Sequence, residues 1–179
     1  MSSGKWPDPT QPSGSAQDAD LSLVATMEKP IHHMSVIRYY RDRSGWDEEQ
    51  IIDPEFGQIE TAIRRMDNLC FPVVDLNPSE YEDDTGILHI VGGDGRFAVA
   101  SLGWRFEDPL GANAEVALWE SDQGYFTKQK NVLTDIHDVL ALARVFAQTS
   151  SHAALQQETE RILGNRARSG PSSNSTPHP

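Results

Sequence analysis

A glycine-rich turn between two apolar segments is the feature that most restricts the fold of this chain. Gly92-Gly93-Asp94-Gly95 separates residues 87–91 from residues 96–102, and both flanking segments are rich in β-branched and apolar side chains. Glycine readily adopts the positive φ angles that a tight hairpin requires. A phosphate-binding loop would need a helix directly after the glycines, whereas Arg96 begins a segment with strand character. The pattern therefore predicts a β-hairpin.

Further segments have the β-branched, aromatic or alternating composition that is typical of strands. They are residues 34–41, 71–76, 114–120 and 125–129. The last two flank Ser121-Asp122-Gln123-Gly124, and we expect a second hairpin around that turn.

Apolar residues at helical spacing predict the helices. The first would begin at Asp53-Pro54, with the Asp53 side chain as its N-cap and Pro54 at its first helical position. Thr134 would cap the second helix, and a third would cover residues 151–163 and end at Gly164. With the strands, these helices predict an α+β fold, an antiparallel sheet of about five to six strands with two to three helices packed on one face.

The two ends of the chain differ in composition from its middle. Residues 1–33 are mostly Ser, Gly, Pro, Asp and Gln, and residues 164–179 are rich in Ser, Asn, Pro and Arg. Such segments bury too little apolar surface to offset the entropy lost on ordering. We expect disordered tails at 1–33 and 164–179 and a single α+β domain at 34–163.

Net charge excludes some classes of partner. The 179 residues include 15 Lys and Arg against 27 Asp and Glu, a net charge of −12. Nucleic-acid binding and attachment to anionic lipid both need clustered basic residues, so neither partner is predicted. The apolar stretch at residues 21–27 is short and lacks a basic leader, so it does not read as a signal peptide. A cytoplasmic location is expected.

No catalytic or metal-binding motif stands out, and no cofactor or metal is predicted. One cysteine, Cys70, excludes an internal disulfide framework, and the six histidines lack metal-ligand spacing. Within its strand, His89 points away from Leu88 and Ile90, and a polar sheet-face residue is the favoured interpretation. A small hydrolase that uses His89 with Asp75 or Cys70 stays open as an alternative.

The acidic residues gather beside aromatic residues in three segments, 80–84, 104–108 and 119–125. Carboxylates speed the encounter with a basic partner, and buried aromatic rings supply binding free energy. These segments are therefore the predicted partner-binding surface. Its residues are Glu80, Glu82, Asp83, Asp84, Trp104, Glu107, Asp108, Trp119, Glu120, Asp122 and Tyr125.

About half of the chain, residues 59–149, resembles the small α+β immunity proteins of bacterial polymorphic toxin systems, particularly the first-numbered immunity family. The resemblance lies in Ile59-Glu60-Thr61-Ala62-Ile63, a strand ending at Asp75-Leu76, the strands around Gly92-Gly93, and the closing helix at residues 139–146. It implies a non-enzymatic inhibitor, made in the cytoplasm, that covers the active site of a cognate toxin. Nuclease and deaminase toxins of this kind are often basic, which an acidic inhibitor would complement.

Two other functional classes remain open from the sequence, the small hydrolase and an acidic adaptor protein. A toxin gene directly upstream would favour the inhibitor, and an operon of metabolic genes would favour the enzyme. The identity of the toxin and the oligomeric state are not encoded in any motif of the sequence.

Overall fold

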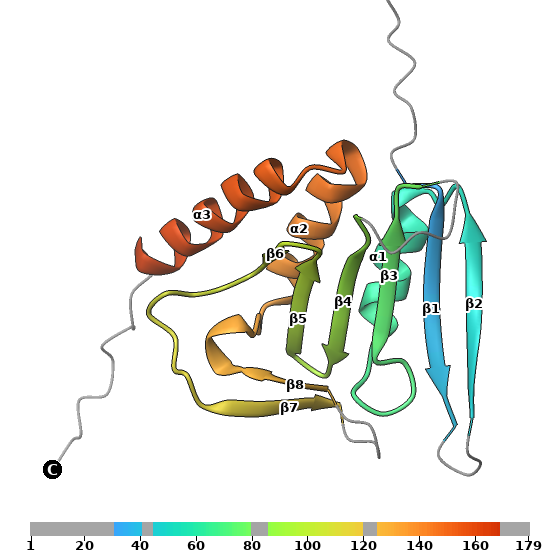
Figure 1. Ribbon diagram of the computed structural model, residues 1–179, viewed down its shortest axis with the longest axis horizontal. Helices are drawn as coiled ribbons and strands as arrows, with labels where there is room; N and C mark the ends of the chain where they lie inside the picture. Colours follow the sequence, from blue (N-terminus) through green and yellow to red (C-terminus); the bar gives the residue numbers. More distant parts are fainter. Residues whose placement is uncertain (1–30, 41–44, 80–85, 120–124, 169–179) are drawn as a thin grey trace, which may run out of the picture.

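The computed structural model describes residues 31–40, 45–79, 86–119 and 125–168. Six strands form one antiparallel sheet in the order β2-β1-β3-β4-β5-β6 (Figure 1). The strands are β1 (His33–Tyr39), β2 (Trp46–Ile52), β3 (Val73–Asn77), β4 (Leu88–Gly93), β5 (Arg96–Ser101) and β6 (Trp104–Arg105).

A second, two-stranded sheet and three α-helices complete the described fold. The small sheet pairs β7 (Glu115–Trp119) with β8 (Tyr125–Lys128), and a short 3₁₀ helix, η1 (Gln129–Asn131), follows it. The helices are α1 (Phe56–Arg65), α2 (Ile136–Thr149) and α3 (His152–Arg168). The predicted α+β class and the antiparallel sheet are confirmed.

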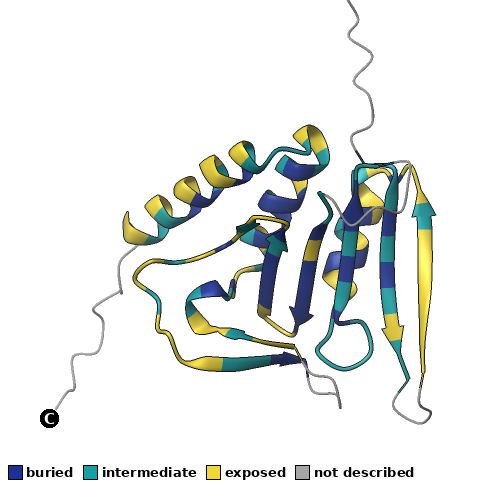
Figure 2. Cartoon of the chain, viewed as in Figure 1, coloured by how far each residue is buried: buried dark blue, intermediate teal, exposed yellow. Residues whose placement is uncertain are grey.

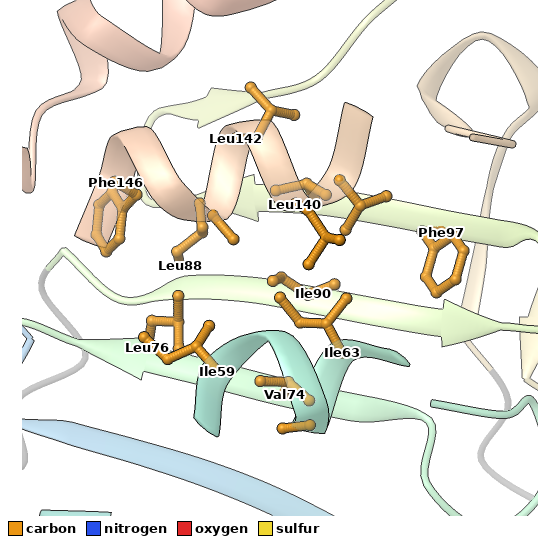
Figure 3. Packing of buried hydrophobic residues seen from close by; sticks show 14 of the residues in the cluster. Ile59, Ile63, Val74, Leu76, Leu88, Ile90, Phe97, Leu140, Leu142 and Phe146 are labelled. Carbon is orange, nitrogen blue, oxygen red and sulfur yellow. The ribbon is translucent and has the colours of Figure 1, made fainter. Parts of the chain in front are cut away.

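The core lies between one face of the large sheet and helices α1 and α2. Alternate strand residues such as Leu76, Leu88 and Ile90 are fully buried and point toward Ile59 of α1 and Phe146 of α2 (Figure 3). Burying one large aliphatic side chain contributes about 1.5–3 kcal/mol. His89, between two buried residues, therefore lies on the opposite face, as its alternation with Leu88 and Ile90 predicts.

The glycine-rich hairpin between β4 and β5 is confirmed. Asp94 and Gly95 form its two-residue turn with φ angles of 50° and 78°, the combination of a type I′ turn. Gly93 has a different reason to be glycine. A Cβ atom there would lie 2.4 Å from the backbone Cα of Asp67, so the loop after α1 packs directly on the glycine backbone.

Helix α1 begins later than the Asp53-Pro54 pattern predicts. Its N-cap is Glu55, which forms a reciprocal capping box with Gln58, while Asp53 has a left-handed φ of 46° and precedes the helix. The prediction of Asp53 as the cap was therefore wrong. Pro54 is buried just before the first turn instead of lying inside it.

Two boundaries in the C-terminal part also differ from expectation. The cap of α2 is Asp135, whose side chain accepts a hydrogen bond from the His137 N–H at 2.8 Å, and not Thr134. Helix α3 passes through Gly164 and ends at Arg168, so residues 164–168 belong to the folded domain and not to a tail. The packing of Leu155 and Ile162 stabilises that helix, and an exposed glycine costs only about 1 kcal/mol in a helix.

Strand β2 was absent from the predicted elements. Its sequence, WDEEQII, holds three consecutive carboxylates, which disfavour a strand by composition alone. Pairing with β1 over all seven residues nevertheless holds it in the sheet. Figure 2 shows β2 as a largely exposed strand beside the buried central strands.

Candidate functional site

Strand β2 is an edge of the large sheet, and its outer side has no neighbouring strand among the described residues. Six of its seven residues are exposed. The two ends carry the large apolar side chains of Trp46, 57% exposed, and Ile52, 59% exposed. A regular, exposed edge of this length is a template for pairing with another chain.

The backbone of β2 alternates between β1 and the free side. The Asp53 N–H donates to the His32 carbonyl at 2.8 Å, and the Gly45 carbonyl accepts from the Tyr40 N–H at 3.2 Å. Odd-numbered residues therefore face β1, because successive residues of a strand direct their N–H and C=O groups to opposite sides. The even-numbered residues direct these groups away from the sheet; they are Trp46, Glu48, Gln50 and Ile52.

The edge is also the most acidic part of the described chain. Residues 45–60 contain no Lys or Arg and six carboxylates: Asp47, Glu48, Glu49, Asp53, Glu55 and Glu60. Only some of these charges are compensated by neighbours. Glu49 pairs with Arg65 at 3.2 Å, Glu60 with Arg64 at 2.8 Å and Asp53 with His32 at 3.4 Å, while Asp47 accepts a hydrogen bond from the Tyr40 hydroxyl.

Glu48 differs from Glu49 in lying on the sheet face opposite the helices. Its Oε1 accepts a hydrogen bond from Gln50 Nε2 at 3.1 Å, and no cation of the described chain pairs with it. With Gln50 it forms the outer wall of a hollow of about 220 Å³ on the open face. The hollow is lined by His33, Ser35, Glu48, Gln50, Asp75, Asn77 and Ile87.

Next to the hollow, Asp75 and His89 form a cross-strand pair. They lie opposite each other in the β3–β4 register, and His89 Nδ1 lies 2.7 Å from Asp75 Oδ1. The His89 side chain is 48% exposed, whereas that of Asp75 is 19% exposed. A carboxylate on Nδ1 fixes the ring orientation, as it does for a histidine that acts as a general base.

The position of Ser35 does not complete a Ser-His-Asp arrangement. In that arrangement the serine lies at Nε2 of the histidine, with the aspartate on the other nitrogen. Here Ser35 pairs in register with Asp75 on the side away from His89, so the aspartate lies between the two. Cys70 precedes β3 and is not among the residues that line the hollow. The structure thus joins His89 with Asp75, and the alternative predicted residue, Cys70, does not line the hollow beside them.

Trp119 does not have the exposure expected of a binding anchor. Only 7% of its surface is exposed, and its ring packs on Tyr39 with a centroid separation of 4.2 Å. Strand β7 packs against β4 and β5 and covers one end of the open sheet face. The Trp119 ring, part of the predicted partner-binding surface, belongs to this internal packing.

Glu107 and Asp108 are engaged within the molecule. Glu107 accepts an ion-pair hydrogen bond from Lys130 Nζ at 2.7 Å, and this contact lowers the pKa of the Glu107 carboxyl. Asp108 Oδ1 accepts from the Leu110 N–H at 2.9 Å, while the Asp108 N–H donates to the Lys130 carbonyl. Both residues organise the loop before β7.

Trp104 and Tyr125 come together at a larger cavity of about 500 Å³ between β5, β6 and β8. Tyr125 is 38% exposed at its rim. The Trp104 indole nitrogen and the Asn131 Oδ1 atom have no hydrogen-bond partner among the described residues, yet both atoms are closed off from solvent. The cavity walls therefore do not present these two groups to a ligand.

The remaining residues of the predicted surface lie outside the described ranges. They are Glu80, Glu82, Asp83, Asp84, Glu120 and Asp122. In their place the structure identifies an acidic edge that sequence reasoning missed. The signal was present in WDEEQII, where large apolar residues bracket three carboxylates.

Comparisons with known proteins found no match to this chain among family models, curated proteins or solved structures. The resemblance to immunity proteins therefore stays a prediction. Within residues 31–40, 45–79, 86–119 and 125–168, no group of three or more His, Cys, Asp or Glu side chains is placed to hold a metal ion. The helices in the same ranges are too short or too polar to cross a membrane.

Proposed function

We propose that this protein binds a basic partner protein through the β2 edge and the adjoining hollow, and that binding inhibits the partner. The observation that carries the proposal is the acidic, exposed edge strand. Residues 45–60 hold six carboxylates and no cation, and Trp46 and Ile52 lie exposed at the two ends of β2. More than half of each of these two large apolar side chains is left uncovered by the described residues.

Charge and apolar contact would have separate roles in such a complex. Exposed carboxylates attract a basic partner over several ångströms and raise the association rate. Trp46 would supply the desolvated anchor that slows dissociation, since aromatic side chains dominate interface hot spots. Glu48 is suited to meet a cation of the partner because no described cation neutralises it.

The class of partner follows from the resemblance. An immunity protein of a polymorphic toxin system neutralises a cognate toxin in the cytoplasm of the producing cell. A nuclease or deaminase toxin would present a basic nucleic-acid site, and the carboxylates of β2 would occupy positions that phosphates take in the substrate. On this proposal the protein is an inhibitor without catalytic activity of its own.

Co-expression with the product of the neighbouring gene tests this proposal. The wild-type chain is expected to protect cells, and the double variant Glu48→Lys/Glu49→Lys is expected to lose protection at low expression. The matched control is Glu115→Lys/Glu160→Lys, which makes the same change of net charge at exposed positions on β7 and α3. Equal protection by both double variants, or a neighbouring product without toxicity, would contradict the proposal.

A hydrolase is the second candidate, and the 2.7 Å contact between His89 and Asp75 is the observation that favours it. On this alternative, His89 would activate a water molecule as a general base. Hydrolysis of a panel of ester and amide substrates by the wild type, lost in His89→Ala, would support it. If His89→Ala protects cells as well as the wild type does, the inhibitor role is independent of this pair.

A further inference from the structure

We infer that the partner contributes an extended basic segment that adds to β2 as a seventh strand of the large sheet. The inference rests on the proposed function and specifies how that function is carried out. Its basis is the backbone of the edge, in addition to the charge of the side chains.

Main-chain groups that have no partner in the described part of the chain make β2 competent for strand addition. Four residues, Trp46, Glu48, Gln50 and Ile52, direct their N–H and C=O groups away from β1. The register with β1 is continuous over the whole strand and contains no bulge, and no proline interrupts it. An added strand would therefore find an N–H donor and a C=O acceptor at every second residue, as in other cases of strand addition.

The opposite edge of the sheet is closed by the chain itself. Phe97 of β5 exchanges two backbone hydrogen bonds with Leu133, at 2.9 and 2.8 Å. Val99 accepts from the Phe106 N–H at 2.9 Å, and β6 pairs with the end of β5. Of the two edge strands, β2 presents seven residues with no neighbouring strand in the described ranges, whereas β6 at the other edge is only two residues long.

Side-chain chemistry selects which strand can be added. The centre of β2 carries Asp47, Glu48 and Glu49, and cross-strand neighbours lie only about 4.5–5.5 Å apart. The partner strand must place Lys or Arg opposite this centre, and apolar residues opposite Trp46 and Ile52. A strand of this composition matches both the charge and the apolar ends of β2.

A second copy of this chain is disfavoured as the occupant. Antiparallel pairing of β2 with its own copy would bring six carboxylates into one seam, three from each strand. Like charges directly opposite each other destabilise a strand pair. The charge of the edge therefore prevents self-association and selects a basic strand.

A synthetic peptide that alternates Lys and Val over nine residues tests strand addition on the full chain. Two derivatives carry backbone N-methyl groups, one on every Lys and the other on every Val. Alternate N–H groups of a strand point to the same edge, so each derivative lacks the hydrogen-bond donors of one edge of the peptide. We expect the unmodified peptide to bind in a salt-sensitive manner. One methylated derivative is expected to bind like the parent and the other about tenfold or more weakly, since several backbone hydrogen bonds are lost.

The matched protein variants are Gln50→Pro and Gln50→Ala. Proline removes an outward N–H and is tolerated on that side of an edge strand, whereas alanine removes only the side chain. Gln50→Pro is expected to bind the unmodified peptide about tenfold more weakly and Gln50→Ala to bind it like the wild type. If Gln50→Pro proves unfolded by circular dichroism, the two methylated peptides decide the question alone.

The possible outcomes separate strand addition from the proposed function. Strand addition is overturned if the two methylated peptides bind as tightly as the parent, or if both lose affinity to the same extent. It is also overturned if the unmodified peptide does not bind. If the Glu48→Lys/Glu49→Lys variant still loses protection in cells in any of these cases, binding of a basic partner stands without it. If protection survives the charge reversal, the proposed function fails as well.

Discussion

The two edges of the large sheet differ in how far the rest of the chain covers them. At the β5 edge, β6, Phe106 and Leu133 occupy the backbone groups, and the Phe106 and Leu133 side chains are fully buried in the core. At the β2 edge, seven paired residues lie open, and six of them are exposed. Helix α1, the helix that follows β2, packs on the core through Ile59 and Ile63.

This difference separates the residues that stabilise the fold from those available for binding. A closed edge contributes buried area and hydrogen bonds, so its sequence is restricted by packing. An open edge contributes less to the core, so packing restricts its sequence less and its side chains can be charged to suit a binding partner. The following variants probe this contrast, beginning with the largest expected effect.

Phe106→Ala should be the most destabilising of these changes. The ring is fully buried where the chain closes the β5 edge. Replacing a buried phenylalanine by alanine costs about 3–5 kcal/mol, because transfer free energy is lost and a cavity remains. Urea unfolding followed by circular dichroism measures this. A loss below about 1 kcal/mol would mean that this edge is not part of the core.

Two tryptophans give a matched comparison of buried and open positions. Trp119→Ala removes a ring that is 7% exposed and packs on Tyr39, and we expect a loss of about 3 kcal/mol. Trp46→Ala removes a ring that is 57% exposed at the β2 edge, and we expect a change within about 0.5 kcal/mol. The same urea titrations apply. Equal losses for the two variants would contradict the assignment of Trp119 to packing and Trp46 to binding.

Charge reversal at β2 should leave the fold intact. For Glu48→Lys/Glu49→Lys we expect a change in the free energy of unfolding within about 1 kcal/mol, since exposed ion pairs contribute little. The ion pair of Glu49 with Arg65 is lost, while repulsion among the neighbouring carboxylates is relieved. A melting temperature close to that of the wild type confirms that any loss of protection in cells comes from binding.

The smallest expected effect is the pH dependence of the stability that Glu107 contributes in the loop after β6. The contact with Lys130 lowers the pKa of the exposed Glu107 carboxyl below its ordinary value. A lowered pKa in the folded state contributes stability above the ordinary carboxyl pKa, and this contribution disappears as the pH falls through the lowered value. Wild type should therefore be slightly more stable than Glu107→Gln near pH 7, and the difference should vanish at strongly acidic pH. A difference that grows on acidification would contradict this sign.

Local patterns predicted much of the fold. The glycines of the β4–β5 hairpin and the apolar stripe of α1 each act over a few residues, so their signals are readable from the sequence. Capping was predicted less well, since Glu55 and Asp135 displaced Asp53 and Thr134 through contacts within one turn of the helix.

The candidate site was less predictable because it depends on tertiary pairing. Strand β2 exists through its register with β1, and the three consecutive carboxylates in its sequence disfavour a strand. Trp119 and Trp46 each stand beside carboxylates in the sequence, and only the packing of β7 against the sheet distinguishes the buried ring from the exposed one. The pairing of His89 with Asp75 needed the β3–β4 register in the same way.

Amide hydrogen exchange of β2, measured with and without the Lys-Val peptide, tests the central claim most directly. In the free protein the amides of Glu49 and Ile51 should exchange slowly because they face β1, and those of Glu48 and Gln50 should exchange quickly. Added peptide should slow exchange at Glu48 and Gln50 selectively. Unchanged exchange at these two amides, with protection appearing elsewhere in the chain, would show that the β2 edge is not the binding surface.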